Sequence, residues 1–260
     1  MQLANRLDLQ KFLNRLLSRS VLTDEEQDAI LDLPCEFDTV KANRDFVGLH
    51  EKVDHASLVV EGLVGRFDQN RDGTRQITAI YLPGDMADLH SVVQPQATSA
   101  LQALSVATIL RVPHAAIREI TARLPALAEA LWRDCMVDAA ILSQWVVNVG
   151  RRDARTRIAH LFCEIATRLR SPDEQESFRF AFAVTQVQIA DATGLTSVHV
   201  NRILRSLRAD GIAEVVNHEV RVLDWKRLAA AGEFNRNYLQ TQIGPDQRLR
   251  IVPAMPALAC

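Results

Sequence analysis

The side chains between residues 197 and 205 could recognise nucleic acid. They belong to a predicted helix whose apolar positions alternate with six outward-pointing residues: Ser197, Val198, His199, Asn201, Arg202 and Arg205. Hydroxyl, amide and guanidinium groups make the hydrogen bonds that read base edges or bind phosphate oxygens. The pattern therefore predicts a helix that enters the DNA major groove. The alternative is the solvated face of an ordinary helical packing unit.

This helix must be held by the segment that precedes it. Thr185–Asp210 is typical of two short helices joined at Gly194, which supplies the left-handed backbone of the turn. Small Ala190 lets the helices cross closely, and Thr185 and Thr196 can each cap the helix that follows. Four apolar side chains fill the crossing: Ile189, Leu195, Val200 and Ile203. The segment is predicted to be a helix-turn-helix.

Two short alternating segments come directly after the helices. Residues 211–216 and 219–223 alternate apolar and polar side chains like strands, and Asn217-His218 between them predicts a tight turn. A helix-turn-helix followed by such a hairpin is a winged helix, whose wing tip normally lies along the sugar-phosphate backbone. This order argues against a generic helical bundle.

Formal charge is distributed unevenly along the chain, whose 260 residues are enough for two compact domains. Residues 1–150 carry 14 basic and 20 acidic side chains, a formal charge of −6, whereas residues 151–227 carry 13 basic and 10 acidic ones, a formal charge of +3. A basic half attached to an acidic half fits a DNA reader carried by a regulatory domain. A solvated helix face also explains so small an excess, so the charge only supports the motif.

The four cysteines lie far apart and form no CxxC pair: Cys35, Cys135, Cys163 and Cys260. Scattered single cysteines are typical of a reducing cytoplasm rather than of a disulfide framework. No apolar run approaches the ~18 residues that a membrane span needs. We therefore expect a cytoplasmic protein without a membrane partner.

Two helices are predicted at the N-terminus, about Leu7–Ser18 and Asp24–Leu31. Met1–Ser20 carries four basic residues and one acidic residue, a composition that an organelle-targeting helix also has. Its apolar residues nevertheless form one amphipathic stripe: Leu9, Phe12, Leu13, Leu16 and Leu17. We expect this stripe to pack on the domain that follows.

Short alternating segments occupy the middle of the N-terminal half. Leu58–Phe67 and Gln76–Leu82 are each predicted to be a strand, joined through residues 70–73, and Leu101–Val112 continues in the same style up to Pro113. Regular short strands separated by Gly, Asp and Pro indicate a β-sandwich or a barrel-like roll.

From Ile117 onward the apolar period becomes helical. One predicted helix of about 25 residues carries most of its apolar side chains on one stripe: Leu127, Leu131, Cys135, Leu142, Trp145 and Val149. We expect a second copy of the chain to cover this stripe, because a palindromic DNA site needs two readers. Packing of the stripe against the roll is the alternative. Gly150 and the residues up to Asp153 form the predicted hinge, and Asp153 can cap the helix Ala154–Leu169.

The order of roll, long helix, hinge and winged helix-turn-helix resembles the bacterial Crp-Fnr family of transcription regulators, from about Leu7 to Leu228. Its most specific segments are TQVQIADATGLTSVHVNRILRSL at Thr185–Leu207 and YLPGDMADL at Tyr81–Leu89. The resemblance implies a cytoplasmic homodimer that binds a near-palindromic promoter site and contacts RNA polymerase.

The resemblance also implies an α+β fold in four parts. These are N-terminal helices with a β-roll sensor domain like a cyclic-nucleotide-binding domain (1–116), a long dimerisation helix (117–150), a winged helix-turn-helix (151–235) and a C-terminal tail (236–260).

The resemblance assigns roles to single residues. Arg202 matches the arginine that family members direct at a guanine, whose O6 and N7 suit a forked guanidinium. Val198 stands where many members have a glutamate that accepts from cytosine, so the half-site should differ from the usual one. Gln186 and Thr196 match positions that usually bind phosphates. Ser197, His199, Asn201 and Arg205 complete the DNA-binding set.

The cofactors known in such families are not expected here. The residues that would bind the ribose and phosphate of a cyclic nucleotide align with Leu89 and Thr98, so cyclic AMP lacks its charge-assisted pair. An iron-sulfur cluster needs clustered cysteines, which the N-terminal stretch lacks. His50, His55 and His90 are too irregularly spaced to suggest a metal or haem site.

Two further patterns do not lead to a site. Asp68–Gly73 begins like a calcium loop, but Ala79 stands where the bidentate carboxylate belongs, so a hairpin turn is expected. No GxSxG, HExxH, phosphate-loop or GxGxxG pattern is present, and we predict no enzyme. The competing interpretation is a cytoplasmic β-roll protein that binds a small molecule or metal and uses its helical C-terminal region only for assembly.

Overall fold

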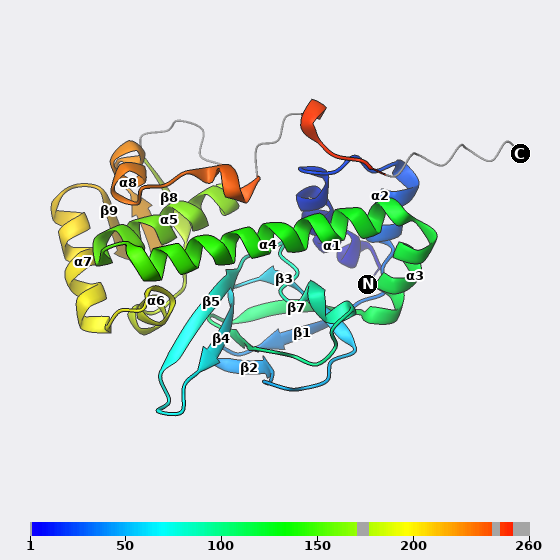
Figure 1. The fold of residues 1–260 in the computed structure, drawn as a ribbon, viewed down its shortest axis with the longest axis horizontal. Coiled ribbons are helices and arrows are strands. Elements are labelled where there is room, and N and C mark those ends of the chain that lie inside the picture. The colour runs from blue at the N-terminus through cyan, green and yellow to red at the C-terminus, as the bar shows by residue number, and fades with distance from the viewer. Residues whose placement is uncertain (1, 171–176, 241–244, 252–260) are drawn as a thin grey trace, which may run out of the picture.

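A long helix organises the computed structural model, which describes residues 2–170, 177–240 and 245–251. The helix α4 (Pro125–Arg151) runs across the molecule, with the β-roll beneath it (Figure 1). The N-terminal helices and α3 (His114–Arg123) lie at one end of α4, and the winged helix lies at the other end. The helix α4 therefore links the N-terminal helical region to the winged helix.

The N-terminal helices are α1 (Gln2–Leu17) and α2 (Asp24–Leu31). The Thr23 hydroxyl accepts a hydrogen bond from Glu26 N, and the Glu26 carboxylate accepts one from Thr23 N, which fixes the start of α2. Four residues of the predicted amphipathic stripe are buried in the core of the roll domain: Leu9, Phe12, Leu13 and Leu16. The fifth, Leu17, is partly buried against the same core. The predicted packing of α1 is confirmed.

The roll consists of two antiparallel sheets, ordered β1-β7-β3 and β2-β6-β4-β5. Their strands are β1 (Glu36–Val40), β2 (Arg44–Val47), β3 (His55–Glu61), β4 (Val64–Gln69), β5 (Arg75–Tyr81), β6 (Ala100–Ala103) and β7 (Ala107–Pro113). A 3-10 helix, η1 (Leu89–Val92), precedes β6. The sequence did not lead us to expect β1 and β2.

The prediction of one strand over Leu58–Phe67 is wrong, because the segment divides into β3 and β4, which belong to different sheets. The break lies at Gly62, whose φ of 79° is left-handed and whose Cβ would lie 2.2 Å from the Val106 carbonyl oxygen. Only glycine fits there, so the chain turns from one sheet to the other.

The helical region after the roll is two helices rather than one. α3 begins before Ile117, and Pro125 opens α4, where its missing N–H costs nothing. The predicted stripe is also partly wrong: Leu127, Leu131 and Trp145 are buried within the chain, whereas Leu142 is 41% exposed. Most of the stripe therefore packs against the roll and the next helix.

The DNA-binding module begins with α5 (Ala154–Arg170), whose Thr156 N donates to Asp153 Oδ1 at 2.9 Å, which confirms the predicted cap. The helices α6 (Gln186–Thr193) and α7 (Ser197–Ala209) follow. A sheet ordered β8-β10-β9 packs beside them. Its strands are β8 (Phe178–Ala181), β9 (Ala213–Val216) and β10 (Glu219–Val222), of which β8 was not predicted.

The chain ends in α8 (Trp225–Ala231) and two 3-10 helices, η2 (Arg236–Leu239) and η3 (Pro245–Gln247). In Figure 1 this orange and red segment returns along α4 toward α1 and α2. The predicted winged-helix domain 151–235 includes α8, whereas for residues 236–260 we expected only a tail.

Candidate nucleic-acid interface

The turn between α6 and α7 has the predicted geometry. Thr185 Oγ1 accepts from Gln188 N at 3.2 Å while Gln188 Oε1 accepts from Thr185 N at 2.7 Å, so both ends of this cap are satisfied. Gly194 ends α6 with a φ of 64°, and Thr196 Oγ1 accepts from His199 N at 3.2 Å at the start of α7. These local contacts fix the angle at which α7 leaves the turn.

The helix α7 has one buried face and one open face. Val200 and Leu207 are fully buried in the module, and Ile203 and Leu204 between them pack against the same core. Val198 is 79% exposed, and Arg202 and Arg205 are exposed. The base-reading positions are therefore accessible in this structure.

The remaining predicted DNA-binding residues differ in their solvent exposure. Ser197, His199 and Asn201 are half-buried, whereas Gln186 and Thr196 are exposed. Asn201 Nδ2 donates to Gln186 Oε1 at 3.1 Å, which joins the second helix to the start of the first. Of the eight predicted residues, five are exposed side chains of α6 and α7 or the turn before α7, three are half-buried, and Asn201 pairs with Gln186.

The arginines of α7 and its surroundings differ in their partners. Within the described part of the chain, the guanidinium groups of Arg202 and Arg205 make no ion pair. By contrast, Arg155 Nη2 lies 2.7 Å from Asp210 Oδ2, and Arg208 Nε lies 3.3 Å from a Glu214 carboxylate oxygen. The two unpaired cations keep their donors available for a ligand.

The wing turn also follows its sequence. Asn217 and His218 both have positive φ, 52° and 62°, as a two-residue hairpin of the right-handed twist requires. Both side chains are exposed at the tip, and β10 pairs β9 from Glu219 to Val222. The wing is a rigid projection beside the recognition helix.

The interior of the roll does not fit a cyclic nucleotide in this conformation. Its cavity measures about 20 Å³, close to the volume that one water molecule requires. Leu89 is buried, whereas Thr98 is exposed and does not line the cavity. Neither residue could grip a phosphate.

Arg66 of β4, which was not predicted from the sequence as a site residue, lines this cavity. Its guanidinium carbon lies 5.3 Å from the centroid of the Tyr81 ring, and burial lowers the pKa of Arg66. Asp88, which accepts from Ser57 N at 2.6 Å, has its pKa raised by burial. The sequence signal that could have identified Arg66 is a basic residue within an otherwise apolar strand segment, between Gly65 and Phe67.

The histidines named in the sequence do not come together. His50 is exposed, His55 Nδ1 lies 2.9 Å from Asp54 Oδ1, and His90 lines the roll cavity with its pKa lowered by burial. Over residues 2–170, 177–240 and 245–251, no three His, Cys, Asp or Glu side chains could share a metal ion. Asp68–Gly73 lies in the β4–β5 turn, where Asp72 Oδ1 accepts from Thr74 N, as predicted.

The three cysteines that the structure describes are poor nucleophiles. Burial raises the pKa of Cys135 to about 12 and raises those of Cys35 and Cys163 as well. A thiol reacts through its thiolate, so these sites are not primed for redox chemistry. Cys260 lies outside the described residues.

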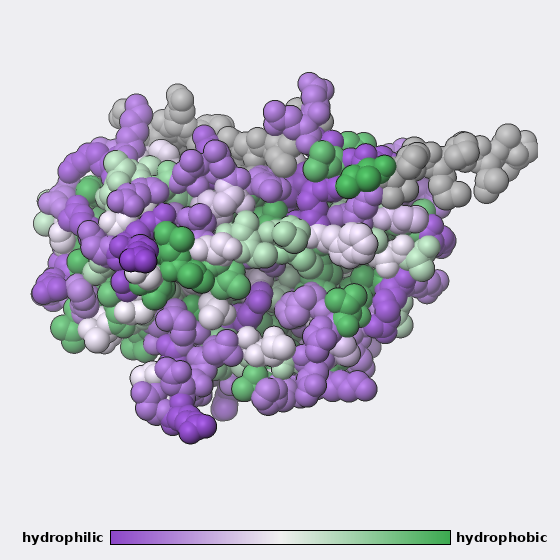
Figure 2. Space-filling model, in the orientation of Figure 1, coloured by the Kyte–Doolittle hydropathy of each residue, from purple (hydrophilic) through white to green (hydrophobic). Residues whose placement is uncertain are grey.

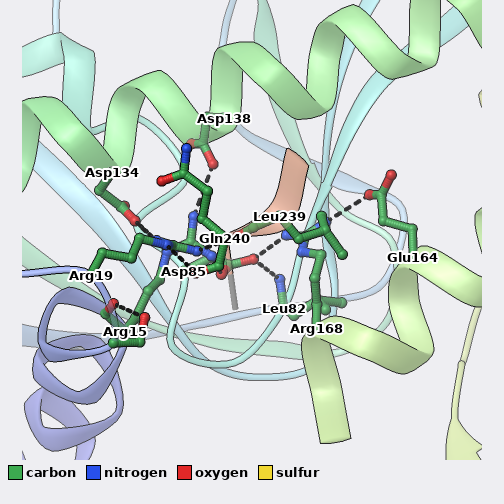
Figure 3. Close-up of polar contacts among 11 residues, drawn as sticks. Arg15, Arg19, Leu82, Asp85, Asp134, Asp138, Glu164, Arg168, Leu239 and Gln240 are labelled. Atoms are coloured by element: carbon green, nitrogen blue, oxygen red, sulfur yellow. Dashed lines mark hydrogen bonds and ion pairs between the residues drawn. The ribbon is translucent and has the colours of Figure 1, made fainter. Parts of the chain in front are cut away.

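A buried ion network joins the roll, α4 and the DNA-binding module (Figure 3). Arg15 of α1 contacts Asp85 at 2.5 Å, Asp134 at 2.6 Å and Asp138 at 3.0 Å. Arg168 of α5 contacts the other oxygen of Asp85 at 2.5 Å and also pairs with Glu164. The sequence analysis named none of these residues as partners.

An apolar stripe remains exposed on α4. Its large members are Trp132, Met136 and Val146, which are 69%, 66% and 67% exposed, and Leu142 lies beside them. With Ala139, Ser143 and Gly150, their spacing alternates between four and three residues, as in a helix that packs against another helix. Figure 2 shows green and pale side chains along this face of α4.

No helix in the described parts of the chain has both the length and the hydropathy needed to cross a membrane.

Comparisons with known proteins match both halves of the chain. Residues 156–231 match the Crp-like helix-turn-helix domain, and residues 40–123 match the cyclic nucleotide-binding domain. The chain is 26% identical to the transcriptional activator protein FnrL of Cereibacter sphaeroides, over 79% of this chain and 84% of FnrL. It is also 26% identical to the nitrogen fixation regulation protein FixK of Azorhizobium caulinodans, over 75% of this chain and 79% of FixK.

The fold is that of solved relatives. The structure of FixK2 from Bradyrhizobium japonicum matches with a TM-score of 0.69 and 24% identity, covering 76% of this chain and 98% of FixK2. The predicted fold class, a β-roll followed by a long helix and a C-terminal winged helix-turn-helix, is confirmed. Residues before 40 and after 231 lie outside both matched domains.

Proposed function

Because the chain belongs to the Crp-Fnr family of transcription regulators, we propose that it binds a near-palindromic promoter site as a homodimer. The family consists of regulators rather than enzymes, and the competing interpretation as a β-roll binding protein has no support from these relatives. The proposed division is a sensor domain over 1–116, a dimerisation region over 117–150, a DNA-binding module over 151–235 and a tail over 236–260.

The observation that carries the DNA contacts is the open face of α7. Arg202 and Arg205 are exposed and make no ion pair with any described residue, and Val198 is 79% exposed on the same helix. We assign Arg202 to a guanine, because its forked donors match O6 and N7. Val198 can contact only a thymine methyl, so cytosine at that position gains nothing. Gln186 and Thr196 are assigned to phosphates.

Site selection from random DNA tests this proposal. The selected site should be a near-palindrome whose half-sites lie about one helical turn apart, each with a required guanine. Affinity should fall steeply with added salt, because phosphate contacts release counterions, while the preference for the palindrome should persist. Binding that is weak and equal for all sequences at every salt concentration would contradict it.

We assign the dimer contact to the exposed stripe of α4, which the roll leaves uncovered. The stripe contains Trp132, Met136 and Val146 at the spacing of a two-helix seam, and a second copy offers the same stripe. This differs from the residues that the sequence favoured, since Leu127, Leu131 and Trp145 are already buried.

Val146→Glu tests the seam. A glutamate there would be buried without a partner in each copy, so the dimer should dissociate at low micromolar concentration in light scattering. Ala122→Glu on the exposed face of α3 makes the same charge change and should remain dimeric. If both variants are dimers, the copies meet elsewhere.

The remaining parts of the proposal concern regulation. We propose that cyclic AMP is not the effector and that neither haem nor an iron-sulfur cluster is bound. The filled roll and the absence of a phosphate-gripping residue at Leu89 and Thr98 support this. Promoter binding places the protein in the cytoplasm, with RNA polymerase as a further partner by family resemblance.

A further inference from the structure

Residues that follow the winged helix pack along α4. Residues 236–240 lie beside α4 and α5, and residues 245–251 lie near α1 and α2, where Figure 1 shows them in orange and red. We call the described residues 236–240 and 245–251 the strap. It contacts α5 at one end, the segment after α1 near its middle, and that segment, α2 and α4 at the other end.

The first end of the strap is anchored in the DNA-binding module. The Tyr238 hydroxyl donates to Glu164 Oε2 at 3.0 Å and lies 3.2 Å from His160 Nε2, and both partners are buried on α5. His160 Nδ1 in turn lies 3.0 Å from the Gly232 carbonyl oxygen. Burial of Leu239 completes the anchor.

From this anchor the strap contacts Arg19, in the turn that follows α1. The Arg19 guanidinium donates to the Leu239 and Gln240 carbonyl oxygens at 3.0 and 3.3 Å, and it also pairs with Asp134 of α4 at 2.8 Å (Figure 3). Arg19 is 4% exposed, so these contacts are shielded from water. One buried side chain therefore joins the turn after α1 to α4 and to the strap.

The far end of the strap is held by α2 and by the segment before it. Arg250 forms a forked pair with both carboxylate oxygens of Glu26 at 2.7 and 2.9 Å. Leu249 exchanges backbone hydrogen bonds with the segment after α1: its N donates to Arg19 O, and its O accepts from Val21 N. Ile251 N donates to Glu129 of α4.

The β-roll and the DNA-binding module also contact each other directly, through α6. Gln188 of α6 donates to Asn43 Oδ1 at 3.0 Å and to Leu104 O at 3.1 Å, and Gln76 of β5 donates to Ala192 O at 3.3 Å. These contacts dock the helix-turn-helix on the roll through α6. The opposite side of the module carries the open face of α7.

We propose that the strap clamps the DNA-binding module onto the roll in the orientation that leaves α7 open, so that a binding-competent reader needs no ligand to order it. An inhibitory clamp would cover the base-reading side chains, whereas here Arg202 and Val198 are exposed while every strap contact is made. The proposal rests on the DNA-binding function proposed above.

Arg250→Glu in the full-length chain tests the clamp. A glutamate facing Glu26 replaces an ion pair by repulsion and should detach the far end of the strap. The apparent affinity of a protein falls in proportion to its competent fraction, so we expect the affinity for the selected site to fall about tenfold, or about 1.4 kcal/mol. Arg248→Glu, two residues away on an exposed side chain, is the matched control and should bind like the wild type.

A chain that ends at Gln240 provides a second variant, because it keeps the Tyr238 and Leu239 anchor. Hydrogen exchange should become faster along α6 and β5 in this chain and in Arg250→Glu, but not in Arg248→Glu. Unchanged exchange and affinity in both variants would show that the strap braces nothing. Tighter DNA binding would make the strap inhibitory and would also overturn the proposal. If the wild type binds no DNA, the proposed function fails, and exchange alone decides whether the clamp exists.

Discussion

Two groups of arginines have opposite surroundings: those on α7, and those in the ion network between the β-roll, α4 and the DNA-binding module, here called the junction. Arg202 and Arg205 project from an open helix face without ion pairs, in a setting where water solvates the charge at little cost. Arg15 and Arg168 are buried, and each contacts at least two carboxylates. A guanidinium that is free can recognise a ligand, whereas one that is fully paired can only hold structure.

The comparison also separates two kinds of energetic consequence. Removing a free surface cation leaves nothing unsatisfied inside the protein. Removing one member of a buried network leaves the remaining charges without a partner and out of water. Substitutions at the junction should therefore affect folding, and those on α7 should affect DNA binding.

The largest effect is expected at Arg15. Arg15→Met leaves Asp85, Asp134 and Asp138 close together with less compensation, so the free energy of unfolding should fall by about 3–5 kcal/mol in urea titrations. Arg6→Met on the same helix removes an exposed pair with Asp28 and Asp32 and should cost no more than about 1 kcal/mol. Equal losses in the two variants would remove the distinction between buried and exposed arginines.

The next effect concerns the other side of the comparison. Arg202→Ala should cost about 1–3 kcal/mol of DNA-binding free energy per half-site and relax the guanine requirement, with unfolding unchanged. Arg208→Ala lies at the far end of α7, beside Glu214, and should keep the base preference. A variant of Arg202 that selects the same site with the same affinity would refute the assignment.

The two regions also differ in how far sequence could predict them. The helix-turn-helix depends on contacts within a few residues, such as the cap of Thr185 with Gln188 and the left-handed Gly194. Such signals are visible in a short window. The junction instead brings Arg15, Asp85 and Arg168 together across more than half of the chain. No local pattern distinguishes these residues from a solvated charged surface.

The same reason explains the misassigned elements. At Gly62 the backbone of Val106, in the bend between β6 and β7, approaches so closely that only glycine fits, and the alternating run Leu58–Phe67 gave no sign of this contact. On α4 both faces are apolar, so periodicity alone did not separate Trp145, which packs inside, from Val146, which stays outside. The strap has no periodic pattern, and its partners lie at the opposite end of the chain.

The buried anchor of the strap should give the protein a pH dependence. The pKa of His160 is lowered to about 4 by burial and by nearby Arg152. Because an unfolded histidine binds its proton near pH 6.5, acid favours the unfolded state between these two values, and stability present above 6.5 is progressively lost. At pH 5 the loss from this residue should be about 2 kcal/mol.

His160→Gln isolates this contribution, since glutamine can still donate to Gly232 but does not titrate. Urea titrations at pH 7.5 and 5.0 should show a smaller loss of stability for the variant. Asp138, whose pKa burial raises to about 6, acts in the opposite direction in both proteins and cancels from the comparison. Identical pH slopes would mean that His160 is protonated in the folded protein at pH 5.

Arg66 shares features with both groups of arginines, and we expect its substitution to change the free energy of unfolding least. It is largely buried like Arg15, yet its Nε has no hydrogen-bond partner among the described residues, and no ion pair in them compensates it. Arg66→Met should therefore change the free energy of unfolding by no more than about 1 kcal/mol, because no carboxylate loses its partner. Calorimetry with cyclic AMP should give no binding to either protein, since the roll cavity holds about one water. Binding to the wild type that disappears in Arg66→Met would show instead that the roll opens around an anion, and it would place Arg66 with the recognising arginines of α7 rather than with the structural arginines of the junction.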